Sequence, residues 1–157
     1  MSGEKTEVLI NKLIELSHGT IDPSADQIRN LLSGNLEGPF HFVNLLAFKE
    51  VADYPADHEL ANHQLSGADA YDKYGAVALS QVTKRGGRLM TLNNIEKKVV
   101  GDSRSWHRIA TMEYRNIEAF TDMLMDPEYQ AALVHRESGL EATEVLITRP
   151  LITEPVG

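Results

Sequence analysis

The sequence of 157 residues contains no cysteine. This excludes disulfide bonds, thiolate zinc sites, iron–sulfur clusters and cysteine nucleophiles. Long hydrophobic runs are also absent, because the apolar stretch from Phe42 to Phe48 is far shorter than the ~20 residues that a membrane helix needs. We therefore expect no interaction with a membrane. The chain opens without a basic and apolar leader, so we expect a cytoplasmic protein.

Positive charge is scarce. The sequence has 15 lysines and arginines against 23 aspartates and glutamates, which gives a net charge of −8. An acidic surface repels phosphate backbones, and the pair Lys84-Arg85 is the one basic cluster that stands out, so we expect no binding to nucleic acid. The chain also lacks a glycine-rich phosphate loop, a dinucleotide fingerprint and a serine nucleophile elbow. We therefore expect no cofactor.

Residues 1–38 are typical of a helical extension. Apolar residues at helical spacing predict a first helix, and a second helix follows with Asp22 as its N-cap, Pro23 in its first position and Gly34 at its end. Helices this short need a surface to pack on. We therefore divide the chain into an N-terminal helical extension, residues 1–38, and one domain, residues 39–157.

The second part of the chain alternates between strand and helix patterns. The predicted elements are a strand at 40–48, a helix at 66–85, strands at 88–100 and 106–114, a helix at 117–125, a new helix at 127–136 and a strand at 142–149. Ser66 is the expected N-cap of the helix at 66–85 and Gly86-Gly87 ends it, while Asp126 caps the helix that begins at Pro127. This β-α-β-β-α-β order predicts an α+β fold of the ferredoxin-like class. Right-handed crossovers favour a four-stranded antiparallel sheet with both helices on one face.

The strand at 40–48 is apolar on both faces. One face carries Phe40, Phe42, Asn44, Leu46 and Phe48, and the other carries His41, Val43, Leu45 and Ala47. The helices cover one face, and the other has too many apolar residues to stay in contact with water. We therefore expect a homodimer in which a second copy covers this face.

Four segments of the sequence resemble a known family. They are the strand 41–48, the helix end Arg85-Gly86-Gly87-Arg88, the strand 106–110, and the segment Asp126-Pro127-Glu128-Tyr129-Gln130-Ala131. Together they resemble domain-of-unknown-function family 1330 over residues 39–150. The resemblance implies a dimeric α/β barrel. Other relatives in that superfamily include cofactor-free monooxygenases, haem-degrading enzymes and lactone isomerases, so fold analogy does not select a reaction, and we predict no haem.

The predicted topology brings several polar and aromatic residues to one end of the sheet, below the long connection 49–65. We take three of them as catalytic candidates: Asn44, Arg108 and His135. Phe48, Tyr71, Tyr74 and Trp106 are candidates for contact with a ligand. His107 alternates with Trp106 and Arg108, which places it on the opposite face of its strand.

Each candidate also has a structural explanation. Asn44 inside an apolar strand serves either a cavity or a cross-strand hydrogen bond, and Trp106 is either a core residue or a pocket wall. An inward Arg108 needs an anion, which is Glu113, Asp72 or the carboxylate of a ligand. His135 serves either as an acid–base group or as a partner for the dipole of its helix.

A metal site has little support in the sequence. Glu59 and His63 have helical spacing, but no third ligand accompanies them, so we expect no metal. We expect a small organic ligand in a pocket between the sheet and the helices. Two functions remain open: a cofactor-independent monooxygenase or isomerase, and a ligand-binding or interaction protein without catalysis.

Overall fold

The computed structural model describes residues 3–17, 19–34 and 36–157. These residues form α1 (Gly3–Leu16), the 3-10 turn η1 (Gly19–Ile21), α2 (Ala25–Ser33), β1 (Phe40–Phe48), α3 (Gly67–Lys84), β2 (Arg88–Asn94), β3 (Arg108–Tyr114), α4 (Ile117–Leu124), α5 (Pro127–Gly139) and β4 (Leu140–Thr148). The expected α+β class is confirmed. None of these helices combines the length and the apolar character that a transmembrane helix requires.

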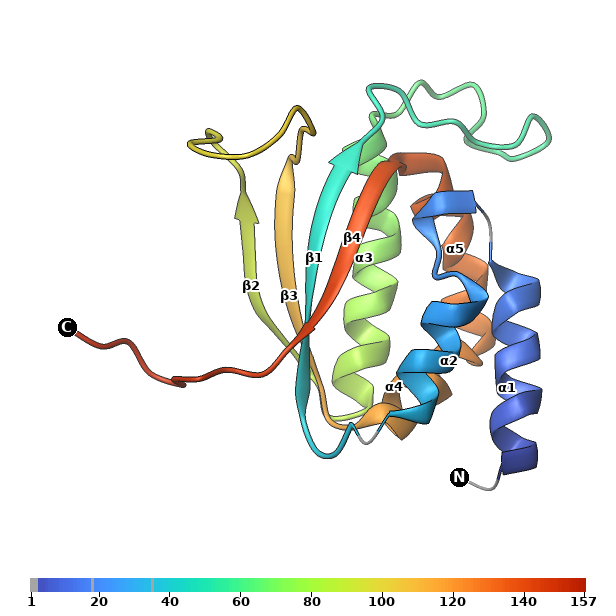
Figure 1. Cartoon of the computed structure of the whole chain (residues 1–157). Helices are drawn as coiled ribbons and strands as arrows, with labels where there is room; N and C mark the ends of the chain where they lie inside the picture. Colours follow the sequence, from blue (N-terminus) through green and yellow to red (C-terminus); the bar gives the residue numbers. More distant parts are fainter. Residues whose placement is uncertain (1–2, 18, 35) are drawn as a thin grey trace.

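The strands of the described chain form one four-stranded sheet in the order β2-β3-β1-β4. Each neighbouring pair is antiparallel, and β1 lies between β3 and β4. The helices pack together on one side of this sheet (Figure 1). An antiparallel sheet with its helices on one face was the arrangement that the order of elements predicted.

The register of the sheet defines its two faces. Phe40 of β1 lies opposite Tyr114 of β3, and Phe42 lies opposite Met112. All four of these side chains belong to the core beneath the helices, so the even-numbered residues of β1 face the helices. The odd-numbered residues, including Val43, face the side of the sheet that no described helix covers.

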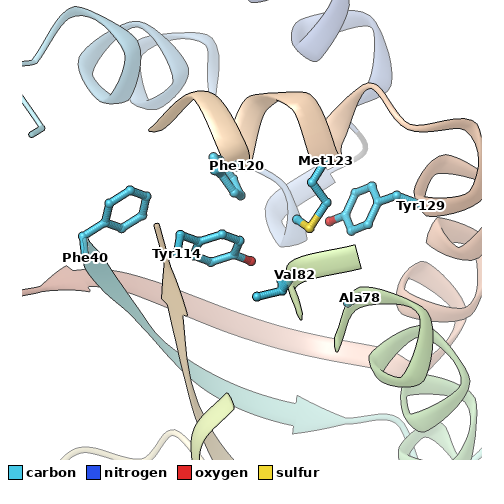
Figure 2. Packing of buried hydrophobic residues seen from close by; sticks show 7 residues of the cluster. All are labelled: Phe40, Ala78, Val82, Tyr114, Phe120, Met123 and Tyr129. Carbon is cyan, nitrogen blue, oxygen red and sulfur yellow. The ribbon is translucent and has the colours of Figure 1, made fainter. Parts of the chain in front are cut away.

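The main core joins β1 and β3 to α3, α4 and α5. Its buried members are Phe40, Ala78, Val82, Tyr114, Phe120, Met123 and Tyr129, whose side chains converge between the sheet and the helices (Figure 2). Aromatic rings dominate it, and Phe42 meets the ring of Phe120 edge-on at a centroid distance of 4.9 Å. Such edge-to-face pairs add to the stabilisation that burial alone provides.

Local signals set the ends of the long helix α3. The side chain of Ser66 accepts a hydrogen bond from the backbone N–H of Asp69, as the N-cap prediction required. At the other end Gly86 adopts a φ of +82°, a conformation that glycine accepts without strain. Both predicted ends are therefore confirmed to within a residue.

Two strands are shorter than predicted. β2 ends at Asn94 instead of residue 100, and β3 begins at Arg108 instead of Trp106. Asn94 lies opposite Arg108, and a single further bond, from Ile95 N–H to the carbonyl of His107, ends the pairing of the two strands. A strand needs a partner for its backbone groups, so the apolar residues beyond this point do not extend the sheet.

The N-cap of α2 was predicted wrongly. Ser24, not Asp22, caps this helix: its side chain accepts from the backbone N–H of Gln27, and the Gln27 side chain accepts from the backbone N–H of Ser24. This reciprocal capping box satisfies two backbone donors at once. Asp22 is therefore available for another partner, Arg136 of α5.

The N-terminal extension packs on the main domain. Ile10, Leu13 and Ile28 form a small buried cluster, against which Leu124 and Met125 at the end of α4 pack. Short helices gain their stability from such contacts rather than from intrinsic propensity. The boundary between an extension at 1–38 and a domain at 39–157 stays a prediction, because shared packing does not show which part folds alone.

Candidate functional site

The ends of four elements converge at the upper edge of the sheet in Figure 1. Directly after β1, the backbone N–H of Lys49 donates to the carbonyl of Gly139 at the end of α5, at 2.9 Å. The carbonyl of Lys49 accepts from the N–H of Gly67, the first residue of α3, at 3.0 Å. The N–H of His107, just before β3, donates to the carbonyl of Leu46 at 2.8 Å. Rigid elements therefore frame this edge.

Two glycines make this convergence possible. A β-carbon on Gly67 would lie 2.6 Å from the carbonyl oxygen of Gly139 and 2.7 Å from the backbone nitrogen of Lys49. A β-carbon on Gly139 would lie 3.0 Å from the backbone nitrogen of Tyr71. These separations leave no room for a side chain, so α3 and α5 approach each other only because both positions are glycine.

A hollow of about 450 Å³ lies at this edge, and we call it the Arg108 hollow. It is lined by Phe48, Lys49, Glu50, Ser66, Ala68, Asn94, His107 and Arg108. Two of these residues, Phe48 and Arg108, are among the candidates that the sequence indicated. Its lining comes from the ends of β1 and β2, the start of β3 and the start of α3.

Arg108 packs on an aromatic ring. Its guanidinium carbon lies 4.8 Å from the ring centroid of Phe48, and its Nη1 donates to Oδ1 of Asp72 at 2.6 Å. The arginine side chain is 15% exposed and the Asp72 side chain is 57% exposed. Within the described residues, Nε and Nη2 of Arg108 have no hydrogen-bond partner, so the group retains donors for a further acceptor.

His107 also packs on Phe48. Its ring stacks on the Phe48 ring with a centroid distance of 5.9 Å, and its Nδ1 accepts from the backbone N–H of Phe48 at 2.9 Å. A backbone N–H can only donate, so Nδ1 carries no proton while this bond is made. The remaining nitrogen, Nε2, then carries the ring proton and is a hydrogen-bond donor.

The expectation that His107 and Arg108 face apart was wrong for this hollow, since both line it. Strict alternation does not apply here, because β3 begins only at Arg108 and the register of β1 shifts between Ala47 and Phe48. The shift turns Phe48 toward both residues.

An aromatic series leads from the hollow toward the core. The ring of Tyr71 lies 5.4 Å from that of Phe48 and 5.3 Å from that of Tyr74. The hydroxyl of Tyr74 is 2.9 Å from the hydroxyl of Tyr129, a core residue. Burial raises the pKa of Tyr71, so this hydroxyl stays protonated at neutral pH. The predicted ligand contacts Tyr71 and Tyr74 thus lie behind the hollow.

Asn44 and Trp106 lie outside the lining of the Arg108 hollow. The side-chain amide of Asn44 donates to the carbonyl of Ala110 at 3.0 Å and to that of Phe42 at 3.3 Å. The bond to Ala110 is the cross-strand hydrogen bond that was the structural alternative for Asn44. Trp106 is half-buried in the connection just before β3.

His135 belongs to a separate cluster on α5. Its Nδ1 is 2.7 Å from the hydroxyl of Tyr54, and the ring of His58 stacks on Tyr54 at 4.6 Å. Burial lowers the pKa of His135, which favours the neutral ring at pH 7. The structure therefore does not bring His135 together with Arg108.

The long connection 49–65 forms a second hollow, of about 720 Å³. Its lining residues are Lys49, Asp53, Tyr54, Pro55, Ala56, Ala61, Asn62, Glu137 and Ser138. The connection is fixed on the domain, because the N–H of Asp53 donates to the carbonyl of Ser138 at 2.9 Å and that of Ala52 to Leu65 at 2.8 Å. The connection lies at the end of the sheet where the sequence placed it, but the sequence gave no sign of the hollow.

Two of the four segments that carry the family resemblance, 85–88 and 126–131, contact each other at the opposite end of α3. Arg85 donates to Asp122 at 2.7 Å and to Asp126 at 3.0 Å. The fully buried Gln81 donates to Glu128 at 2.6 Å. The hydrogen bond from Arg85 lowers the pKa of Asp126, which also caps α5. We call these contacts of Arg85 and Gln81 with Asp122, Asp126 and Glu128 the Arg85 clamp. The Arg85 clamp has a structural role and lies far from the Arg108 hollow.

One buried ion pair gave no signal in the sequence. Arg136 of α5 contacts Asp22 at 2.6 Å, and both side chains are almost fully buried. The two residues are 114 positions apart, so no local pattern could have joined them. Among the described residues, no three histidine, aspartate or glutamate side chains are close enough to hold a metal ion.

Comparison with known proteins identifies the family but no activity. The description "Domain of unknown function (DUF1330)" belongs to the family that matches residues 59–150. A search of curated proteins found no match.

Several solved structures resemble this chain. A protein of unknown function from Rhodopseudomonas palustris is 28% identical, with a TM-score of 0.75 over 87% of this chain and 100% of its own. A methylated form of that protein gives 28% identity and a TM-score of 0.76, over 87% and 98% of the two chains.

A third structure is a dimeric protein of unknown function and ferredoxin-like fold from Bacteroides fragilis. It is 11% identical, with a TM-score of 0.44 over 72% of this chain and 97% of its own, and supports no argument here. The family match spans more than half of the sequence. The chain therefore belongs to the family described as domain of unknown function DUF1330.

Proposed function

We propose that this protein binds a small planar organic anion in the Arg108 hollow. The observation that carries the proposal is the Arg108 guanidinium, which is largely shielded from water, packs on Phe48 and keeps two nitrogens without a partner among the described residues. A charge-assisted hydrogen bond from a shielded guanidinium to a carboxylate is stronger than one between neutral groups. Phe48 adds an apolar aromatic side chain to the lining of the hollow.

The charges and donors around the hollow support an anion. Among the lining residues Lys49 and Arg108 are positively charged and Glu50 is negatively charged, and the Nε2–H of His107 is a further donor. Each cation also has a carboxylate neighbour, since Asp53 lies 4.0 Å from Lys49 and Asp72 lies 2.6 Å from Arg108. The volume of about 450 Å³ falls within the range of small-molecule sites. A carboxylate on an aromatic ring satisfies both the donors and the apolar wall.

Asp72 is compatible with such a ligand. Its carboxylate occupies only Nη1 of Arg108 and its side chain is more than half exposed. A ligand can therefore use Nε and Nη2 while Asp72 keeps the guanidinium oriented. Were Asp72 displaced, its carboxylate would return to water at little cost.

Of the two functions left open by the sequence, binding without turnover fits this arrangement better. A cofactor-independent oxygenase or isomerase needs a group that accepts a proton from its substrate. In the hollow, His107 already uses Nδ1 as an acceptor for Phe48. Asn44 and His135, two of the three catalytic candidates, make their hydrogen bonds elsewhere.

We also propose that the protein is a homodimer, closed into an α/β barrel by the face of the sheet opposite the helices. The register puts Val43, Leu45, Ile109 and Leu146 together on that face. Within the described chain no helix covers them, and Leu146 is 50% exposed. Thr111 and Glu144 share this face with the apolar residues. Apolar side chains gathered on an uncovered face favour association, and a second copy supplies a matching surface.

Amide chemical shifts of the labelled protein test the binding proposal. We expect benzoate to shift the backbone signals of Phe48, His107 and Arg108. Benzamide has the same ring without the charge, and cyclohexanecarboxylate has the charge without the flat ring, so both should bind more weakly. Equal shifts with benzoate and benzamide, or benzoate shifts confined to other parts of the chain, would contradict the proposal.

A further inference from the structure

A second arginine is buried near the same edge, where it is paired with the N-terminal extension. Nη1 of Arg136 in α5 lies 2.6 Å from Oδ1 of Asp22, and Nη2 of Arg136 donates to the carbonyl of Ile21. The two charged side chains are 13% and 14% exposed. The pair therefore joins the main domain to a segment that lies outside the family match.

Three tyrosines interact electrostatically with this arginine. Tyr71, Tyr74 and Tyr129 all lie within electrostatic range of Arg136. The rings of Tyr71 and Tyr74 are 5.3 Å apart, and those of Tyr74 and Tyr129 are 5.9 Å apart. A shielded guanidinium among aromatic rings is a combination that recognises organic carboxylates, because it offers both fixed donors and apolar walls.

The turn that delivers Asp22 packs beside β4. The 3-10 turn η1, Gly19–Ile21, contains no buried residue, and Gly19 has a φ of +65°. The helices of the extension are attached elsewhere, through the buried cluster that includes Ile10 and Ile28. Displacement of η1 from Arg136 would therefore not break the packing of α1 and α2 on α4.

We propose that Arg136 is the cationic centre of a carboxylate-binding site, and that Asp22 fills this site in the structure as an internal ligand. Docking of η1 and binding of a free aromatic carboxylate then exclude each other. A buried ion pair contributes little net stability compared with its desolvation cost, so one carboxylate can replace another on Arg136 without a large penalty. The site is separate from the Arg108 hollow, although Tyr71 lies within electrostatic range of both arginines.

The test removes the internal ligand and supplies a free one. In Asp22→Ala we expect a lower melting temperature than in the wild type, and a rise on addition of sodium acetate or sodium benzoate that sodium chloride does not produce. A tethered carboxylate acts at an effective concentration on the order of mM or above, so its removal should strengthen benzoate binding by about tenfold or more. Calorimetric titration measures this change.

Three further variants separate the explanations. Asp26→Ala removes an aspartate of the same extension whose side chain is 98% exposed, and it should behave like the wild type. Adding Arg136→Met to Asp22→Ala should abolish the gain in benzoate affinity. Adding Arg108→Met instead should leave that gain intact, which distinguishes this site from the hollow of the proposed function.

Other outcomes would overturn the inference. If acetate and benzoate affect Asp22→Ala no more than Asp26→Ala, the pair serves only to attach the extension. The same conclusion holds if the gain in affinity survives Arg136→Met. If Asp22→Ala does not fold, the isosteric Asp22→Asn is tested in the same titrations, and an unchanged benzoate affinity in that variant would equally contradict the proposal.

Discussion

The glycine contact between α3 and α5 supports a sharp prediction, because it fixes the edge where the Arg108 hollow lies. In Gly67→Ala the new β-carbon would meet the carbonyl oxygen of Gly139 at 2.6 Å and the backbone nitrogen of Lys49 at 2.7 Å. These neighbours are backbone atoms, which cannot rotate away as a flexible side chain does. The helix start must move instead, and Lys49, which lines the hollow, moves with it.

The magnitude follows from the overlap. Separations this short require shifts of several tenths of an ångström in packed backbone, and overpacking of this kind costs about 1–3 kcal/mol, occasionally more. The clash of Gly67→Ala involves two chain segments at once. We therefore expect a loss of about 3 kcal/mol in the free energy of unfolding.

Gly75→Ala is the matched control. Gly75 lies in the interior of the same helix, and a β-carbon there meets nothing within 4 Å. This change should stabilise the protein by about 0.5–1 kcal/mol, because alanine is the better helix former. Urea unfolding followed by circular dichroism measures both variants. If Gly67→Ala were as stable as Gly75→Ala, the close approach that frames the hollow would not exist in solution.

The uncovered face of the sheet, the cluster around His135 and the Arg85 clamp each support a further prediction. Val43→Glu should convert the proposed dimer to a monomer in sedimentation experiments, whereas Val8→Glu, at an exposed position of α1, should not. Burial lowers the pKa of His135 in the folded chain, so the unfolded chain binds more protons, and the free energy of unfolding should fall as the pH drops below about 6.5. His135→Gln should flatten this dependence between pH 7.5 and 5.5, while His63→Gln, at an exposed position, should leave it unchanged. Arg85→Met should lower the free energy of unfolding by about 1–2 kcal/mol without affecting benzoate binding, because its bonds lie at the far end of α3.

Elements with strong local signals were predictable from the sequence. Ser66 before α3, Gly86 after it and the pair Asp126-Pro127 before α5 each act through backbone groups within a few residues. The alternation along β1 likewise assigned its two faces correctly. Such signals depend on neighbours in sequence, so they need no knowledge of the rest of the fold.

Errors arose where a distant partner decides between two local possibilities. Asp22 and Ser24 are both good N-caps, and the choice follows from Gln27 on one side and from Arg136, 114 positions away, on the other. β2 stops at Asn94 because Arg108, the residue opposite it, is the first residue of the partner strand β3. Apolar residues continue in the sequence beyond Asn94, but within the described residues they have no partner strand.

The candidate site was predictable in place but not in composition. The topology alone brought Phe48, Arg108 and the start of α3 to one edge, and Asp72 was among the acceptors considered for Arg108. The role of His107 depends on a register shift in a neighbouring strand, and that of Lys49 on two glycines in separate helices. Neither the register shift nor the contact between the two glycines can be inferred from the spacing of residues in the sequence.

The central claim is that the Arg108 guanidinium recognises the anionic group of a ligand. Calorimetric titration of benzoate into the wild type and Arg108→Met tests it most directly, with urea unfolding of both proteins alongside. Methionine keeps much of the volume and removes the charge. Since a charge-assisted hydrogen bond contributes about 1.5–3 kcal/mol, the Kd for benzoate should rise roughly tenfold to a hundredfold.

The stability of Arg108→Met should change by only about 0–1 kcal/mol, because the Asp72 side chain left behind is 57% exposed. An unchanged Kd for benzoate, together with a loss of several kcal/mol in the free energy of unfolding, would show that Arg108 serves the fold and not a ligand, and would contradict the account.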